Sequence, residues 1–199
     1  MSFFVVRAVS AAGARASQDR ADVFARGETA VLVVADGAGG VGDGARAADH
    51  LVDRVREAVL DADFDLAAPA AWSRLFADVD RALVGVGETT AVVVVLMTGL
   101  LVHAAAGDSE AWLVRADASE RLTAGASRAR LGTGRARPSA SVRRELDGRL
   151  VVASDGLFRH TRSEAIERVV RAEKFGAVAD ALVALTRGED DVAVLVAER

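Results

Sequence analysis

Residues 29–44 decide the fold of this chain; they read Thr-Ala-Val-Leu-Val-Val-Ala-Asp-Gly-Ala-Gly-Gly-Val-Gly-Asp-Gly. The first seven, Thr29–Ala35, are apolar and rich in β-branched side chains, which predicts a buried strand. Asp36 follows at the C-terminal end of that strand, and five of the next eight residues are glycine. A carboxylate beside a loop with almost no side chains lets the backbone approach a small charged group closely.

Two kinds of small group could occupy this loop. Backbone N–H groups at the start of the following helix could hold a phosphate. Alternatively, Asp36 and a carbonyl freed in the glycine turn could hold a divalent cation. The carboxylate favours the cation, because it would repel a phosphate unless a metal stood between them. The loop lacks the Lys of the Walker pattern, and Asp36 stands where a dinucleotide-binding strand would simply turn. A tight turn without a ligand is the remaining alternative.

Composition limits the class of protein. The 199 residues predict a single domain, 1–199, large enough to bury a core. The longest apolar run, Thr89–Met97, is far shorter than the ~20 residues of a membrane span, and no signal peptide is visible, so a cytoplasmic protein is expected. The absence of Cys excludes disulfides, thiolate metal sites and cysteine nucleophiles. A net charge of -4 without a basic cluster argues against a nucleic-acid partner. A monomer is expected.

The order of the expected elements indicates an α+β fold, with antiparallel sheets covered by helices rather than a parallel sheet. Two glycine-containing turns predict hairpins, at Gly99 and at Asp147-Gly148, and Ser163 is expected to cap a helix. The expected strands are Phe3–Val9, Asp22–Ala25, Thr29–Ala35, Thr89–Thr98, Leu100–Ala106, Glu110–Arg115, Ser141–Leu146, Arg149–Ser154 and Asp191–Ala197. The expected helices are Ala45–Leu60, Ala70–Val84, Ser163–Val170 and Phe175–Thr186.

Acidic residues at strand ends are the candidates for chemistry. Two of them end apolar strands and precede glycine, two open the last strand, and the others lie in loops beside strands. If these ends converge, the carboxylates cannot all stay ionised without cations. Ligation by oxygen alone, without His or Cys, selects Mg²⁺ or Mn²⁺. Any single one of them could instead be an ordinary turn residue. The set comprises Asp19, Asp36, Asp108, Asp155, Asp190 and Asp191.

Five short motifs, in order along nearly the whole chain, resemble those of the metal-dependent serine/threonine protein phosphatases of type 2C. Each motif is weak alone, but the five in the correct order are a specific signal. They are Val34-Ala35-Asp36-Gly37-Ala38-Gly39-Gly40, Glu88-Thr89-Thr90-Ala91, Gly107-Asp108-Ser109, Ala153-Ser154-Asp155-Gly156-Leu157 and Asp190-Asp191-Val192-Ala193-Val194.

The resemblance implies a four-layer α-β-β-α sandwich of two antiparallel sheets flanked by helices, with two Mn²⁺ or Mg²⁺ ions at one end. It implies that Asp36 bridges the ions, that the Gly37 carbonyl binds one, and that Asp155 and Asp190 hold the other. Asp19 would act mainly through metal-bound waters, and Asp108 would serve a weaker third ion. The implied substrates are phosphoserine or phosphothreonine proteins, opposite a kinase.

The chain departs from the family pattern in four places. Gln18 stands where an acidic residue is usual, and Ala38 replaces a frequent His. Arg15 lies one residue later than the usual phosphate-binding Arg, whose place Ala14 takes. Only residues 124–154 separate Thr123 from Asp155, so the flap subdomain is expected to be deleted or much reduced.

The residues fit phosphomonoester hydrolysis by a water bridging two metals, which lower its pKa and neutralise the phosphoryl oxygens. Arg15 could bind those oxygens bidentately; otherwise the metals alone, or an Arg from residues 128–137, would hold them. His103 is expected to be a core residue, and His160 could approach the site as a proton donor. Two alternatives are a metal-poor pseudophosphatase that serves as a binding module, favoured by Gln18 and the short flap, and a phosphatase dedicated to one specialised protein partner.

Overall fold

The computed structural model of the chain describes residues 3–12, 16–144 and 146–199. Two five-stranded antiparallel sheets form its centre. The first has the order β1 (Phe4–Ser10), β12 (Val192–Glu198), β11 (Arg149–Ala153), β8 (Glu110–Val114) and β9 (Ser119–Arg121). The second has the order β10 (Ser139–Arg143), β7 (Leu100–Ala106), β6 (Ala91–Met97), β3 (Thr29–Ala35) and β2 (Arg20–Arg26). A separate pair consists of β4 (Gly37–Gly42) and β5 (Gly87–Thr89).

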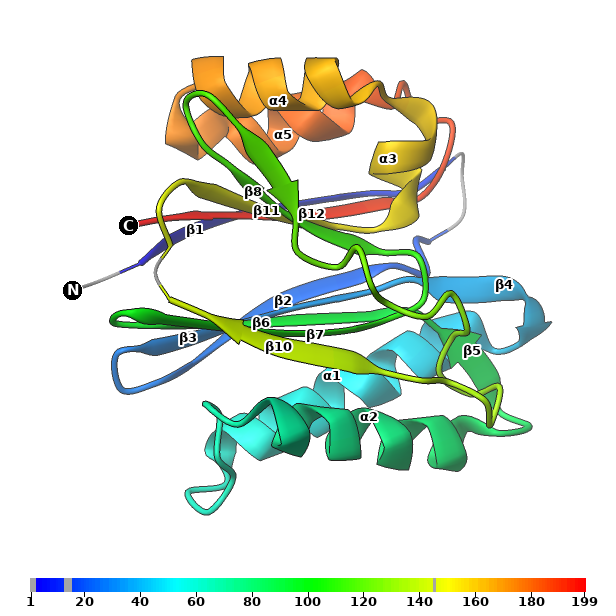
Figure 1. Cartoon of the computed structure of the whole chain (residues 1–199). Coiled ribbons are helices and arrows are strands. Elements are labelled where there is room, and N and C mark those ends of the chain that lie inside the picture. The colour runs from blue at the N-terminus through cyan, green and yellow to red at the C-terminus, as the bar shows by residue number, and fades with distance from the viewer. Residues whose placement is uncertain (1–2, 13–15, 145) are drawn as a thin grey trace.

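Helices cover both outer faces of the stacked sheets (Figure 1). One pair packs on the second sheet and three helices lie over the first, which confirms the expected α+β sandwich of four layers. The pair consists of α1 (Gly44–Leu60) and α2 (Pro69–Leu83), and the three are α3 (Asp155–His160), α4 (Ser163–Ala172) and α5 (Phe175–Leu185).

The central strand β3 is buried on both faces because its apolar residues alternate between two cores. Leu32 and Val34 point between the two sheets, whereas Val31 and Val33 point toward α1 and α2. Successive side chains of a strand face opposite sides of the sheet, so an unbroken apolar run fits a strand covered on both sides. Asp36, directly after this strand, is therefore carried to the edge of the core on a rigid element.

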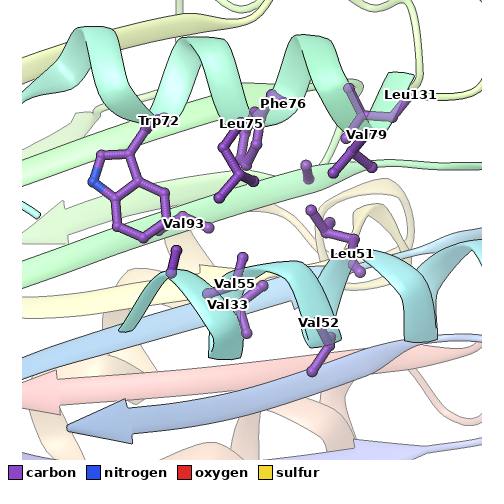
Figure 2. Close-up of a cluster of buried hydrophobic side chains, with 14 of the residues drawn as sticks. Val33, Leu51, Val52, Val55, Trp72, Leu75, Phe76, Val79, Val93 and Leu131 are labelled. Atoms are coloured by element: carbon purple, nitrogen blue, oxygen red, sulfur yellow. The ribbon is translucent and has the colours of Figure 1, made fainter. Parts of the chain in front are cut away.

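The helix-covered core fixes α1 and α2 against the second sheet. Trp72 and Phe76 of α2 point toward Leu51 and Val55 of α1 and toward the sheet (Figure 2). The indole N–H of Trp72 donates to the Leu66 carbonyl at 3.0 Å, which satisfies its one polar atom in the core. These contacts anchor α1, whose N-terminus begins directly after the glycine loop.

Two expectations about local structure are wrong. The hairpin at Asp147-Gly148 does not form, because 139–143 pairs with β7 in one sheet and 149–153 pairs with β8 and β12 in the other. The turn instead crosses between sheets, and the Asp147 carboxylate accepts from Arg115 Nε at 2.7 Å. Ser163 is the first helical residue, after Arg162, rather than a side-chain cap.

Short elements account for the other differences. Residues 37–42, expected as a loop, pair with β5 as a two-stranded ribbon. Asp155 begins the short helix α3 rather than a turn, and the three-residue β9 was not expected. Elements this short carry too few residues for a periodic pattern. Within the described residues, no helix is both long and apolar enough to cross a membrane.

Candidate metal centre

Strand ends and loops from five parts of the chain meet at one end of the sandwich, beside α3 and β4 (Figure 1). They enclose a cavity of about 210 Å³. Four of its acidic residues come from different segments: Asp19 precedes β2, Asp36 follows β3, Asp155 opens α3 and Asp190 precedes β12. The lining consists of Gln18, Asp19, Asp36, Gly37, Ala38, Arg130, Asp155, Arg159, Asp190 and Asp191.

Three carboxylates form the centre of the cluster. Asp36, Asp108 and Asp155 each offer one oxygen, and these three oxygens lie within 4.8 Å of one another. Asp108 reaches the group from the turn between β7 and β8. Like charges at this separation repel strongly, so the arrangement favours a cation between them.

Thr90 forms hydrogen bonds with both Asp36 and Ser109, and so connects the two segments that carry Asp36 and Asp108. Its hydroxyl accepts from the Asp36 N–H at 3.0 Å and shares a 2.6 Å hydrogen bond with the Ser109 hydroxyl. Its own N–H donates to the Asp36 carbonyl at 2.9 Å. Thr90 and Ser109 are both buried. The sequence motif that contains Thr90 therefore fixes Asp36 relative to the turn that carries Asp108.

The glycines at the start of the loop are required by close backbone packing. A Cβ at Gly37 would lie 2.3 Å from the Gly44 carbonyl oxygen, and one at Gly44 would lie 2.7 Å from the Ala38 carbonyl oxygen and 2.6 Å from Gln18 Oε1. Neither position leaves room for a side chain. The N-terminus of α1 is thereby held against residue 18 and the first acidic loop.

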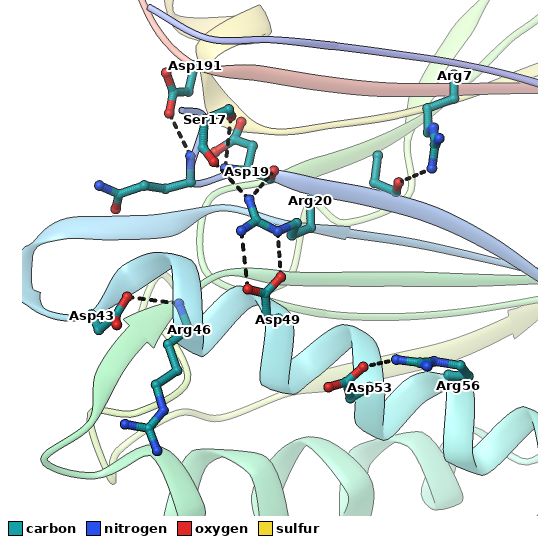
Figure 3. A network of polar contacts seen from close by, with 12 residues as sticks. Arg7, Ser17, Asp19, Arg20, Asp43, Arg46, Asp49, Asp53, Arg56 and Asp191 are labelled. Carbon is teal, nitrogen blue, oxygen red and sulfur yellow. Dashed lines mark hydrogen bonds and ion pairs between the residues drawn. The ribbon is translucent and has the colours of Figure 1, made fainter. Parts of the chain in front are cut away.

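Asp191 anchors the first acidic loop, since its carboxylate accepts from the backbone N–H groups of Ala12 at 2.8 Å and Gln18 at 2.9 Å. Arg20 holds the same loop from the other side (Figure 3). Its guanidinium donates to the Ser17 carbonyl at 2.8 Å and pairs with Asp49 at 2.6 Å. Each oxygen of Asp191 thus accepts one backbone hydrogen bond of this loop.

Burial and mutual repulsion raise the pKa values of Asp19, Asp36 and Asp155. Burial raises the pKa of Asp19 to about 8, with the charge of Asp36 as the next cause. Burial also raises the pKa of Asp36 to about 6, and the Asp155 charge adds to it. The pKa of Asp155 is raised by burial and then by Asp108. The cluster therefore holds protons near neutral pH when no cation compensates it.

Several buried oxygens of the cluster have no hydrogen-bond partner among the described residues. Gln18 Oε1, Asp19 Oδ2 and Asp108 Oδ1 are buried and, within the part of the chain that the structure describes, accept no hydrogen bond. Buried polar atoms are nearly always satisfied, so unpaired oxygens around a cavity indicate a ligand. Oxygen donors of this kind suit Mg²⁺ or Mn²⁺.

Two arginines, Arg130 and Arg159, reach the cluster. The sequence indicated Arg130 only as part of the range 128–137 and did not indicate Arg159. Arg159 pairs with Asp155 four residues earlier on α3, and its guanidinium lies 3.7 Å from Asp190 and 3.9 Å from Asp108. Arg130 Nη2 lies 3.9 Å from Asp108 Oδ1. The spacing of Arg159 from Asp155 would have predicted the first pair, had α3 been expected.

Three other expected residues have different outcomes. His160 lies beside the site, with Nδ1 at 3.0 Å from Glu189 and Nε2 at 3.7 Å from Asp190. His103 is buried in β7, as expected for a core residue. Arg15, the expected phosphate ligand, lies outside the described residues together with Ala14.

Comparison with known proteins gives the same fold. No protein-family model matches the sequence, and no curated protein matches it. The solved structures do match. The serine/threonine phosphatase Stp1 from Staphylococcus aureus has a TM-score of 0.89 at 18% identity, covering 100% of this chain and 96% of that chain. The chain has the fold of the bacterial serine/threonine phosphatases.

Two further structures agree. The catalytic domain of the serine threonine protein phosphatase PstP, solved in complex with two manganese ions, has a TM-score of 0.83 at 21% identity and covers 98% of this chain and 97% of its own. The Mycobacterium tuberculosis phosphatase PstP/Ppp has a TM-score of 0.83 at 20% identity and covers 100% of this chain and 99% of its own. The fold expected from the resemblance to type 2C phosphatases is therefore confirmed.

Proposed function

We propose that this protein is a metal-dependent phosphatase that hydrolyses phosphoserine and phosphothreonine on proteins. The observation that carries the proposal is the cluster of Asp36, Asp108 and Asp155, whose oxygens converge within 4.8 Å at the loop end of a phosphatase fold. The buried oxygens of Gln18 and Asp19 without partners support the same reading, because both are hard donors and both residues line this small polar cavity.

The donor set fits two Mn²⁺ or Mg²⁺ ions. Asp36 would hold both, the Gly37 carbonyl would hold one, and Asp155 and Asp190 would hold the other. Asp19 would support the first ion, chiefly through water, and Asp108 would hold a weaker third. When bound, such ions supply an activated water and neutralise phosphoryl oxygens. The chain's own contribution is to fix these donors through Thr90 and Asp191 and to keep the cavity small.

The remaining features of the proposal concern context. We place the protein in the cytoplasm as a single-domain monomer over residues 1–199, acting on phosphorylated proteins in opposition to a serine/threonine kinase. Within the described residues, 122–138 contain no helix or extended strand between β9 and β10, which supports a reduced flap.

A metal-poor pseudophosphatase is the second candidate, and Arg159 favours it. The guanidinium of Arg159 pairs with Asp155 and lies near Asp190 and Asp108, the carboxylates that a second and third ion would use. A resident cation at these carboxylates competes electrostatically with a metal. Under this alternative the chain would keep the fold and bind phosphoproteins without hydrolysing them.

Hydrolysis of p-nitrophenyl phosphate tests the proposed function. We expect activity with Mn²⁺ or Mg²⁺ and none in EDTA, with activity recovered when Mn²⁺ is restored. Calorimetric titration of Mn²⁺ under the same conditions separates the two candidates. Mn²⁺ binding without hydrolysis, or no binding at all, would contradict the catalytic proposal and favour the binding module.

Arg159→Ala tests the competition at the cluster. Removing the guanidinium takes away the cation that Asp155, Asp190 and Asp108 share, while Arg130 stays 3.9 Å from Asp108, so we expect Mn²⁺ to bind severalfold more tightly in calorimetry. Arg162→Ala is the matched control, because Arg162 is exposed and lies three residues after Arg159, just before α4. This substitution should not change the affinity for Mn²⁺. Unchanged or weaker Mn²⁺ binding in Arg159→Ala would show that Arg159 does not occupy the place of an ion.

A further inference from the structure

We propose that Arg130 binds the phosphoryl group of the substrate and that the buried carboxylate of Asp80 positions it. This inference rests on the proposed function and names the residue that recognises its substrate. Arg130 lines the same cavity as Asp36, Asp155 and Asp190. It comes from residues 122–138, where the flap was expected to be deleted or much reduced, rather than from the first acidic loop.

The guanidinium of Arg130 is near the cluster without being committed to it. Its closest ion pair is with Asp108, at 3.9 Å, which is longer than a hydrogen bond. Its Nε is buried and donates no hydrogen bond within the described residues. A guanidinium carries five N–H donors in a planar fork that matches phosphate oxygens. Arg130 therefore offers unused donors to an oxyanion in the cavity.

A short chain of hydrogen bonds fixes the backbone at Arg130 relative to Asp36. The next residue, Leu131, is fully buried and exchanges two backbone hydrogen bonds with Thr89, at 2.9 and 3.0 Å. Thr90 follows Thr89 directly and bonds the backbone of Asp36 on both sides. The distance between Arg130 and the central carboxylate is therefore set by paired backbone, not by a free loop.

Asp80 holds the other side of the same loop. This residue of α2 is only 5% exposed, yet its carboxylate is well satisfied. It accepts from the backbone N–H groups of Gly132 at 2.8 Å, Gly134 at 3.0 Å and Ala136 at 3.2 Å. A buried carboxylate bonded to three N–H groups of one loop fixes its conformation strongly. Asp80 thus acts on the site through Arg130 and is a positioning residue.

Arg159, the other arginine in the cavity, differs from Arg130 in the exposure of its side chain and in its pairing with a carboxylate. Its side chain is 55% exposed and pairs with Asp155, whereas the side chain of Arg130 is 32% exposed. A guanidinium hydrogen-bonded to a carboxylate has fewer donors left for phosphate. Arg130 lies 3.9 Å from its nearest carboxylate and keeps more of its donors free, so it is the better placed of the two.

The test measures binding of inorganic phosphate to the Mn²⁺-loaded protein by calorimetry, beside the kinetics of p-nitrophenyl phosphate hydrolysis. We expect Arg130→Ala to weaken phosphate binding about tenfold, as for the loss of one charge-assisted contact. KM measured at saturating Mn²⁺ should rise severalfold. Arg130→Lys should recover only part of the affinity, because an ammonium lacks the fork. Arg135→Ala, exposed on the same loop, is the control and should match wild type.

Asp80→Asn tests the positioning role. We expect a smaller rise in KM than for Arg130→Ala, and no further rise when the two substitutions are combined, because Asp80 acts through Arg130. Additive effects in the double variant would show that Asp80 has only a structural role.

Failure of this inference can be told from failure of the proposed function. Phosphate binding that is equal in wild type and Arg130→Ala, or absent in wild type, would overturn the assignment of Arg130. A wild type that binds phosphate through Arg130 but does not hydrolyse the ester would leave the assignment intact and overturn only the phosphatase proposal.

Discussion

Asp36→Asn is expected to abolish hydrolysis of p-nitrophenyl phosphate, with a fall in kcat on the order of 100-fold or more. Asp36 offers an oxygen within 4.8 Å of those of Asp108 and Asp155, and in the proposed site it holds both ions. The amide has the same shape but no charge and a single acceptor oxygen. Phosphate release measures the loss of hydrolysis, and Mn²⁺ calorimetry measures the loss of metal binding. Both losses should appear together.

Asp117→Asn, on an exposed turn, is the matched control and should behave as wild type. Asp155→Asn and Asp190→Asn should reduce activity strongly but less completely, since each is expected to hold one ion only. Wild-type rates in Asp36→Asn would rule out the two-metal reading of the cluster.

The metal-free protein is expected to lose stability as the pH rises from 5 to 8. The pKa of Asp19 is raised by burial to about 8 and that of Asp36 to about 6, against 3.8 for an ordinary Asp. Between these values the folded state binds more protons than the unfolded state, so the free energy of unfolding falls with pH, by on the order of a few kcal/mol. The stabilisation is complete below pH 4 and lost above pH 8.

Urea unfolding in EDTA at pH 5, 6, 7 and 8 measures this effect, and Asp19→Asn should flatten the dependence because it removes the most shifted group. Saturating Mn²⁺ should reverse the slope, since metal binding requires ionised carboxylates and stabilises only the folded state. A free energy of unfolding that rises with pH in EDTA would mean that the cluster is ionised without a cation.

The sandwich could be predicted because its strands carry strong patterns. Thr29–Ala35 is an apolar run rich in β-branched residues and long enough to form a full strand. It is buried as expected. The Asp147-Gly148 hairpin failed because a turn signal fixes a change of direction but not the pairing partner. That partner was chosen by tertiary packing, which places 139–143 on β7 and 149–153 between β8 and β12.

The acidic cluster could be anticipated for a similar reason. Asp36, Asp155 and Asp190 adjoin ends of strands, and those ends meet at one edge of the sandwich. The positions of Arg130 and Arg159 could not be anticipated, because each arginine lies on an element whose sequence has no periodic pattern. Arg159 lies on a six-residue helix, and Arg130 lies in a loop whose path is set by Asp80. Asp191 was a member of the acidic candidate set, and its carboxylate accepts from backbone N–H groups of the first acidic loop, a contact that no sequence pattern predicts.

Anomalous diffraction from crystals of the protein in Mn²⁺ tests the two-metal claim most directly. We expect two manganese peaks that both contact the Asp36 carboxylate, one on the side of the Gly37 carbonyl and one on the side of Asp155 and Asp190. A cluster with no manganese at Asp36, and with Arg159 still paired to Asp155, would contradict the claim.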